Sequence, residues 1–125
     1  MKQAKLIAIA IVKHDDQFLV GKRPEGVELA GLAEFPGGKV HPSESPAAAA
    51  ARECLEETGL EVRATQLLHQ HVHEYSYGSV DLRFYLCKPV GPSARPAAPF
   101  RWVDRDQLAS LEFPAGNQPV LRLLV

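Results

Sequence analysis

The sequence predicts a single α/β domain that spans residues 1–125. Apolar runs that suit β-strands lie on both sides of an alanine-rich segment that suits a helix, so strands and helices must share one core. The length of 125 residues is that of one ordinary domain. With 46% hydrophobic and 23% charged residues, the chain has the composition of a folded globular protein rather than a disordered one.

Two strands and a long loop are expected in the first third of the chain. Residues 5–13 and 17–22 are apolar runs separated by the turn residues 14–16, which predicts a pair of neighbouring strands. Residues 24–43 are rich in glycine and proline and predict a loop. This loop leads into the only long helical segment.

That helix is expected from Pro46 to Thr58. Ser45 is a favourable N-cap, and Pro46 suits the first helical position, where its missing N–H costs no hydrogen bond. Five alanines follow with high helix propensity, and Gly59 is a typical C-terminal stop.

Further strands and two short helices are expected after it. Residues 60–73 and 79–88 predict strands, the second with alternating apolar and polar positions. Residues 100–103 predict a short strand, and residues 104–107 resemble a capping box at the start of a brief helix. Residues 117–124 predict a final helix.

Charge and composition exclude several classes of function. Fourteen Lys and Arg against 15 Asp and Glu give a net charge of −1 without a basic stripe, which disfavours binding to polymeric DNA or RNA. The apolar run at residues 6–12 is too short to cross a membrane. Cys54 and Cys87 stand in apolar contexts that suit buried thiols in a reducing compartment. We therefore expect a cytoplasmic protein that binds a small ligand.

Three glutamates share one face of the predicted helix. Glu53, Glu56 and Glu57 are separated by three and four residues, so their side chains project within one turn of each other. Arg52 can relieve only part of their repulsion, by pairing with Glu56. Either the three form a solvated charged face, or they bind a hard divalent cation such as Mg²⁺, Mn²⁺ or Ca²⁺.

The spacing around these glutamates favours the metal site. Gly38, Glu44, the Arg52-Glu53 pair, the Glu56-Glu57 pair and Gly59 occur in a frame that resembles the Nudix box, GX5EX7REUXEEXGU, in which U is a bulky aliphatic residue. One position departs from the pattern: Cys54 occupies the first U. Because cysteine packs as a small hydrophobe, this departure should not remove the chemistry.

The resemblance extends over nearly the whole chain. Residues 19–24, 34–39 and 113–120, with the sequences LVGKRP, EFPGGK and FPAGNQPV, are similar to the MutT type of Nudix hydrolase. This resemblance implies an α/β/α sandwich with a mixed sheet. It also implies a requirement for Mg²⁺, for which Mn²⁺ can substitute, and hydrolysis of a nucleoside triphosphate to the monophosphate and pyrophosphate. The substrates implied are oxidised purine nucleotides such as 8-oxo-dGTP.

The same resemblance implies the metal ligands and the catalytic residues. The carbonyl of Gly37 and the carboxylates of Glu53, Glu56 and Glu57 hold metal, and Glu53 is our first choice for the general base. Arg52 is then expected to have a structural role and not to react itself. Its planar guanidinium can hold Glu44 or a ligand carboxylate with two hydrogen bonds.

Five further residues are candidates for contact with the substrate. Arg23 and Lys39 are expected to bind phosphate, with Lys39 near the leaving pyrophosphate, although a surface cation is the alternative for each. Phe35 either borders the base or belongs to the core, and Glu34 either orients its loop or contacts the substrate. Asn117 offers a donor and an acceptor that can recognise a purine edge, but it would also serve as the N-cap of the last helix.

One departure from the family leaves the metal count and the function open. MutT-type enzymes carry a further glutamate where this chain has Pro96, and Glu74 or Asp81 would have to replace it. A pyrophosphatase for CTP or modified pyrimidine triphosphates is one alternative function. A catalytically weak, nucleotide-sensing module is another. A small nucleotide is the expected partner in each case, and the protein is expected to be a monomer or homodimer.

Overall fold

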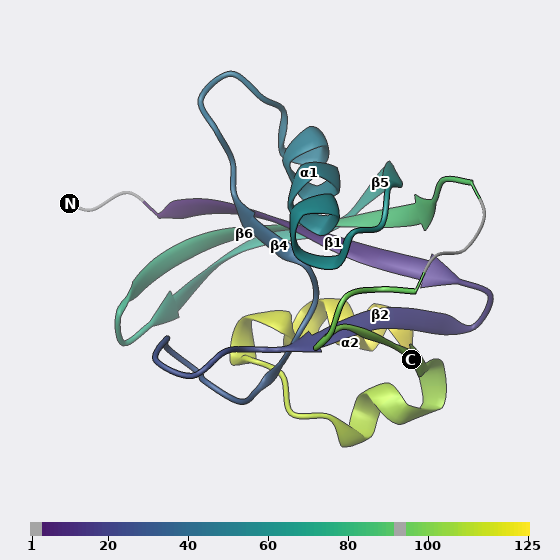
Figure 1. Ribbon diagram of the computed structural model, residues 1–125. Helices are drawn as coiled ribbons and strands as arrows, with labels where there is room; N and C mark the ends of the chain where they lie inside the picture. The colour runs from purple at the N-terminus through teal and green to yellow at the C-terminus, as the bar shows by residue number, and fades with distance from the viewer. Residues whose placement is uncertain (1–3, 92–94) are drawn as a thin grey trace.

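The computed structural model describes residues 4–91 and 95–125 and shows strands flanked by helices on both sides (Figure 1). Its strands are β1 (Lys5–His14), β2 (Gln17–Lys22), β3 (Ala33–Glu34), β4 (Gly37–Lys39), β5 (Val62–Tyr75), β6 (Gly78–Pro89) and β7 (Arg101–Asp104). Its helices are α1 (Pro46–Thr58), the 3₁₀ turns η1 (Arg105–Ser110) and η2 (Ala115–Asn117), and α2 (Gln118–Leu124). The predicted α/β sandwich is confirmed.

Strand β1 is the centre of the mixed sheet. It pairs in parallel with β6 from Lys5 opposite Val80 to Val12 opposite Cys87, and β6 forms an antiparallel hairpin with β5. On its other side β1 pairs antiparallel with β4, and its last two residues pair with β2. The main order is therefore β3-β2-β1-β6-β5, with β4 beside β1 and β7 beside β2.

Two apolar cores lie on opposite faces of this sheet. Alternation along β1 sends Ala8 and Ala10 towards α1, where they pack with Ala49, Ala50 and Cys54. The residues between them, Ile9 and Ile11, face the other core, which contains Phe84 of β6, Leu108 of η1, and Val120 and Leu124 of α2. The small residues under α1 let the helix lie close to the sheet, which brings its glutamates near β4.

The predicted elements agree with the structure except in two places. The segment expected to be a loop, residues 24–43, contains the short strands β3 and β4. The capping box predicted at residues 104–107 is wrong: η1 is a 3₁₀ turn, and the Asp104 side chain makes no capping bond. Its carboxylate instead accepts a hydrogen bond of 2.9 Å from the Gln17 side chain on the neighbouring strand.

Two further expectations concern the cysteines and the membrane. Cys54 and Cys87 are both free and buried, as predicted. Among residues 4–91 and 95–125, no helix has the length and apolar character needed to cross a membrane.

Candidate active site

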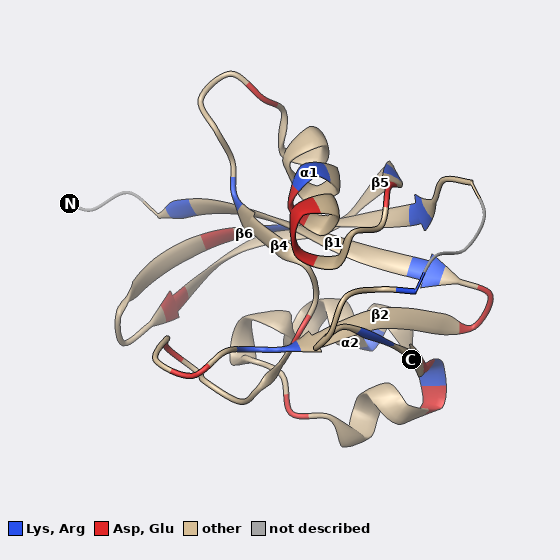
Figure 2. Cartoon of the chain, in the orientation of Figure 1, with Lys and Arg blue, Asp and Glu red and all other residues tan. Residues whose placement is uncertain are grey.

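Helix α1 positions the three glutamates through its caps and its buried face. Ser45 Oγ accepts a hydrogen bond of 3.1 Å from Ala48 N–H, and Gly59 ends the helix in the left-handed conformation with φ of 78°. The buried face of the helix includes Ala49, Ala50, Cys54 and Thr58. Cys54, the departure from the box, is fully buried, and its Sγ lies 3.5 Å from the Thr58 hydroxyl. The acidic residues of the C-terminal turns therefore remain outside the core (Figure 2).

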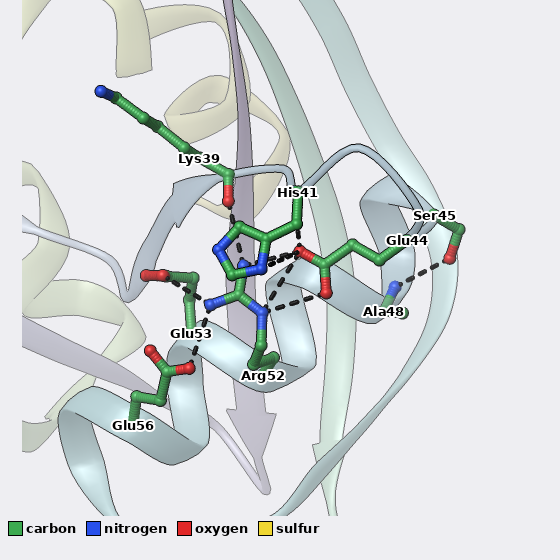
Figure 3. A network of polar contacts seen from close by, with 8 residues as sticks. All are labelled: Lys39, His41, Glu44, Ser45, Ala48, Arg52, Glu53 and Glu56. Atoms are coloured by element: carbon green, nitrogen blue, oxygen red, sulfur yellow. Dashed lines mark hydrogen bonds and ion pairs between the residues drawn. The ribbon is translucent and has the colours of Figure 1, made fainter.

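Arg52 holds three carboxylates at once (Figure 3). Its guanidinium donates to Glu44 at 2.6 Å and 3.0 Å, to Glu53 at 2.9 Å and to Glu56 at 3.0 Å. It also donates to the Lys39 carbonyl oxygen at 3.0 Å, which ties α1 to β4. The hydrogen bonds from Arg52, with a further one from the His41 backbone, lower the pKa of Glu44 to about 2. This geometry agrees with the predicted role of Arg52, which is to orient the carboxylates.

Arg52 supports a prediction on catalysis. Arg52→Lys should lower kcat by more than it raises KM, because one ammonium group cannot reproduce a planar fork that orients three carboxylates. Steady-state kinetics at saturating metal measure both parameters, and circular dichroism checks the fold. A change in KM alone would show that Arg52 acts in substrate binding instead.

Glycines in β4 allow the sheet to approach α1 closely. A Cβ atom at Gly38 would overlap the Glu53 carboxylate, and one at Gly37 would overlap the Ala8 carbonyl. The backbone N–H of Gly37 donates to Glu57 at 3.3 Å. The structure thus brings the predicted ligands Gly37, Glu53 and Glu57 to one place, and Arg52 connects Glu56 to it.

Negative charge is under-compensated at this point. Burial, with added repulsion from Glu34, Glu53 and Glu56, raises the pKa of Glu57 to about 7 despite its bond from Gly37. Burial also raises the pKa of Glu34, against the opposing effect of Arg23. Neither Glu34 nor Glu57 is paired with Arg52. A divalent cation would supply the missing positive charge.

The oxygen atoms of these residues suit such a cation by their chemistry, although they do not surround a single point. Carboxylate and backbone oxygens are the ligands that hard divalent ions prefer. In the described part of the chain, no group of three or more His, Cys, Asp or Glu side chains is arranged to hold a metal. One Arg52 nitrogen bonds both Glu53 and Glu56.

A pocket of about 270 Å³ lies beside β4 on the face opposite α1. Its floor is apolar and comes from Ile7 and Ile9 of β1 and Val80 and Leu82 of β6. The predicted substrate residues around it are Arg23, Glu34, Phe35, Lys39 and Asn117. Figure 3 shows the Lys39 side chain pointing away from the Arg52 network. Residues predicted separately from the sequence are therefore joined in one cavity.

Arg23 and Phe35 each have two sets of contacts. Arg23 lies 3.4 Å from Glu34 and donates to the Glu28 carbonyl at 2.9 Å, so it also fixes the loop between β2 and β3. Phe35 is 5% exposed and stacks on Phe113 with ring centres 4.7 Å apart. It therefore belongs to the core and also lines the pocket, while contact with a base stays a prediction.

Asn117 does not cap the last helix. It occupies the N-cap position, but its φ of −88° and ψ of −10° are helical, and its side chain makes no capping bond. The preceding turn η2 continues into α2, which removes the extended backbone that a capping side chain requires. The Asn117 amide instead donates to the Pro114 carbonyl at 3.3 Å, and the residue is 8% exposed at the pocket.

The two proposed substitutes for the missing glutamate, Glu74 and Asp81, each bond a residue outside the glutamate cluster. Ala97 N–H donates to the Thr58 carbonyl at 2.9 Å, so the segment containing Pro96 does lie at the end of α1. No acid occurs there. Asp81 lies 3.3 Å from Arg83, Glu74 bonds Ser79, and neither lines the pocket.

Sequence analysis did not single out several residues of the pocket, three of which carry polar groups. Lys5, Tyr75 and Tyr77 line it, and the Tyr75 hydroxyl accepts a hydrogen bond of 2.7 Å from Gly116 N–H. The signal for Lys5 was present, because it precedes Ile7 and Ile9 with the two-residue period of one strand face. The tyrosines lie near the hairpin turn, and nothing in the sequence placed that turn at the pocket.

Comparisons with known proteins agree over most of the chain. The family model described as "NUDIX domain" matches residues 7–123. The 8-oxo-dGTP diphosphatase of Haemophilus influenzae is 31% identical over 122 residues, which cover 95% of this chain and 90% of that protein. The CTP pyrophosphohydrolase of Escherichia coli is 41% identical over 76 residues, 61% of this chain and 56% of that protein. A MutT NUDIX hydrolase structure from Burkholderia pseudomallei has a TM-score of 0.80 at 23% identity and covers 99% of this chain and 100% of that chain, which shows the same fold.

Proposed function

The chain belongs to the Nudix family and is a hydrolase of the MutT type, and on this premise we propose that it cleaves oxidised purine nucleoside triphosphates such as 8-oxo-dGTP. The products would be the nucleoside monophosphate and pyrophosphate. One observation carries the proposal: β4 separates a pocket that contains Asn117 and Phe35 from the glutamates of α1. A nucleotide with its base in that pocket can extend its phosphates across Gly37 and Gly38 to the carboxylates.

The metal site of this proposal consists of Glu53, Glu56, Glu57 and the Gly37 carbonyl. We propose Mg²⁺ as the physiological ion, with Mn²⁺ as a substitute. When bound, such an ion neutralises phosphate charge and makes water more acidic. Arg52 fixes the carboxylates before the substrate arrives, and Glu44 in turn fixes Arg52.

Glu53 is the proposed general base. Its carboxylate lies against Gly38 and is oriented by Arg52, so it faces the strand over which the phosphates pass. It would accept the proton of the attacking water. Lys39, two residues beyond Gly37, would bind the leaving pyrophosphate, and Arg23 would bind phosphate after releasing the Glu28 carbonyl. Glu34 would keep Arg23 in place.

Metal affinity should depend on Glu56 and Glu57. Glu56→Gln and Glu57→Gln should each raise the Mg²⁺ concentration for half-maximal rate by at least about tenfold, since loss of a residue that only orients a metal ligand already costs that much. The larger effect is expected at Glu57, because it is half-buried and no arginine bonds its carboxylate. Metal titrations of the rate measure this, and unchanged midpoints would reject the ligand roles.

The CTP-type alternative is favoured by one comparison. The CTP pyrophosphohydrolase has the higher identity, although over a shorter part of the chain. Pyrophosphate release from 8-oxo-dGTP, dGTP, CTP and dCTP, with and without Mg²⁺, decides between them. A preference for 8-oxo-dGTP supports the proposal, a preference for CTP or dCTP overturns it, and no turnover of any would favour a nucleotide-sensing module.

Three further proposals concern the domain, its partners and its cellular compartment. We propose that residues 1–125 act as one catalytic domain on free nucleotides and have no part in binding polymeric nucleic acid. The buried free thiols suit a reducing compartment, so we propose a cytoplasmic site of action.

A further inference from the structure

Lys5 adds a cation to the pocket that the proposed reaction does not use. It is the first residue of β1, and it lines the pocket together with Ile7 and Ile9. Among the ion pairs between described residues, none involves Lys5. Its ammonium group therefore remains available to a ligand at the edge of an otherwise apolar floor.

The register of the sheet places Lys5 far from the phosphate end. Ile9 is the partner of Gly37 in β4, and Lys5 lies four residues earlier in β1, a separation of about 13 Å along the strand. That distance exceeds the length of a lysine side chain. Lys39 is only two residues from Gly37, so Lys39 and not Lys5 is the lysine that can reach phosphates near Glu53 and Glu57.

Lys5 lies instead at the end of the pocket that contains Asn117. Lys5 is the partner of Val80, and the next pair on the same face is Ile7 with Leu82. A Cβ at Gly116, the residue before Asn117, would meet Leu82 and the Tyr75 hydroxyl. Lys5 and the segment that carries Asn117 therefore both lie next to the Ile7–Leu82 pair of the pocket floor.

We propose that Lys5 is a specificity-determining residue that donates a hydrogen bond to a carbonyl oxygen of the substrate base. A lysine ammonium has donors only, so it favours a base that presents a carbonyl and disfavours one that presents an amino group at the same place. The inference rests on the proposed function, since it takes the base to occupy this pocket.

Binding without metal tests the proposal directly. Lys5→Met keeps most of the side-chain volume and removes the charge, and Lys5 is exposed, so the fold should be kept. Calorimetry should show that Lys5→Met weakens binding of 8-oxo-dGMP and dGMP roughly tenfold or more, the scale of a charge-assisted hydrogen bond. Binding of dAMP, which has an amino group at position 6, should change less than about threefold.

Three controls separate this role from others. Lys5→Arg keeps a donor and should restore most of the dGMP affinity. Lys13→Met makes the same change on the same strand outside the pocket and should have no effect. Inorganic pyrophosphate should inhibit the reaction of Lys39→Met more weakly than that of the wild-type protein. It should inhibit the reaction of Lys5→Met as strongly as that of the wild-type protein.

Each outcome decides for or against the role of Lys5. Equal losses for dGMP and dAMP, no loss for either, or weaker pyrophosphate inhibition in Lys5→Met would overturn the proposal. If the wild-type protein prefers CTP, the proposed function fails by itself. The Lys5 variants are then compared for CMP, whose base carries a carbonyl at position 2, and an unchanged CMP affinity would overturn the Lys5 role as well.

Discussion

Glu53→Gln is expected to lower kcat at least about 100-fold, the lower part of the range for loss of general base catalysis. The substitution keeps the length of the side chain and its fit against Gly38, and the amide oxygen can still accept from Arg52. It removes the charge and the basicity. The loss should therefore appear in turnover while the melting temperature stays close to that of the wild-type protein.

The matched control for Glu53 is Glu61→Gln. Glu61 is exposed beyond the end of α1, and its only recorded interaction among the described residues is through its backbone carbonyl. This variant should keep wild-type kcat. Near-normal turnover in Glu53→Gln, with the protein folded and metal saturating, would exclude Glu53 as the base and direct attention to Glu34 and Glu57.

The elements and the glutamate face of α1 could be predicted because their determinants are local. Ser45, Pro46 and Gly59 fix the bounds of α1 within the chain itself, and the positions of Glu53, Glu56 and Glu57 follow from helical periodicity. The contacts of Arg52 with Glu53 and Glu56 are also local. The family resemblance added Gly37 and Glu44, which lie outside the helix.

The pocket was only partly predictable because long-range pairing builds it. Strands β3 and β4 are two and three residues long, and they exist because β2 and β1 offer edges to them. Such short strands carry no periodic signal of their own. Lys5 does share the period of Ile7 and Ile9, but the place of that strand face at the pocket follows from the parallel pairing of β1 with β6.

The two N-caps that the sequence suggested and the structure lacks have a feature in common. Asp104 and Asn117 are both residue types that favour N-caps, and both stand where a helix begins. In each case the side chain found another partner: Gln17 for Asp104 and the Pro114 carbonyl for Asn117. Both helix starts are 3₁₀ turns, and the partner of Asp104 lies on the neighbouring strand whereas that of Asn117 lies in its own turn.

Asn117 makes no capping bond, so we expect its substitution to change substrate choice and not the stability of the last helix. Asn117→Ala should leave the melting temperature nearly unchanged, because no helix hydrogen bond is lost at the N-cap. It should remove about 1–3 kcal/mol of interaction with the base, the cost of leaving polar groups unpaired in a closed pocket. The loss should fall on oxidised guanine, so the ratio of kcat/KM for 8-oxo-dGTP over dGTP should fall towards one.

Asn117→Asp is the isosteric companion of this variant. It keeps the acceptor and removes the donor, so a base that needs both should lose the same preference, while inhibition by inorganic pyrophosphate stays unchanged in both variants. The measurements are kcat/KM for 8-oxo-dGTP and dGTP together with thermal melting of each variant. A large drop in melting temperature with an unchanged substrate ratio would show that Asn117 stabilises the fold and does not bind the base. A residue that only supports η2 and α2 cannot distinguish 8-oxo-dGTP from dGTP.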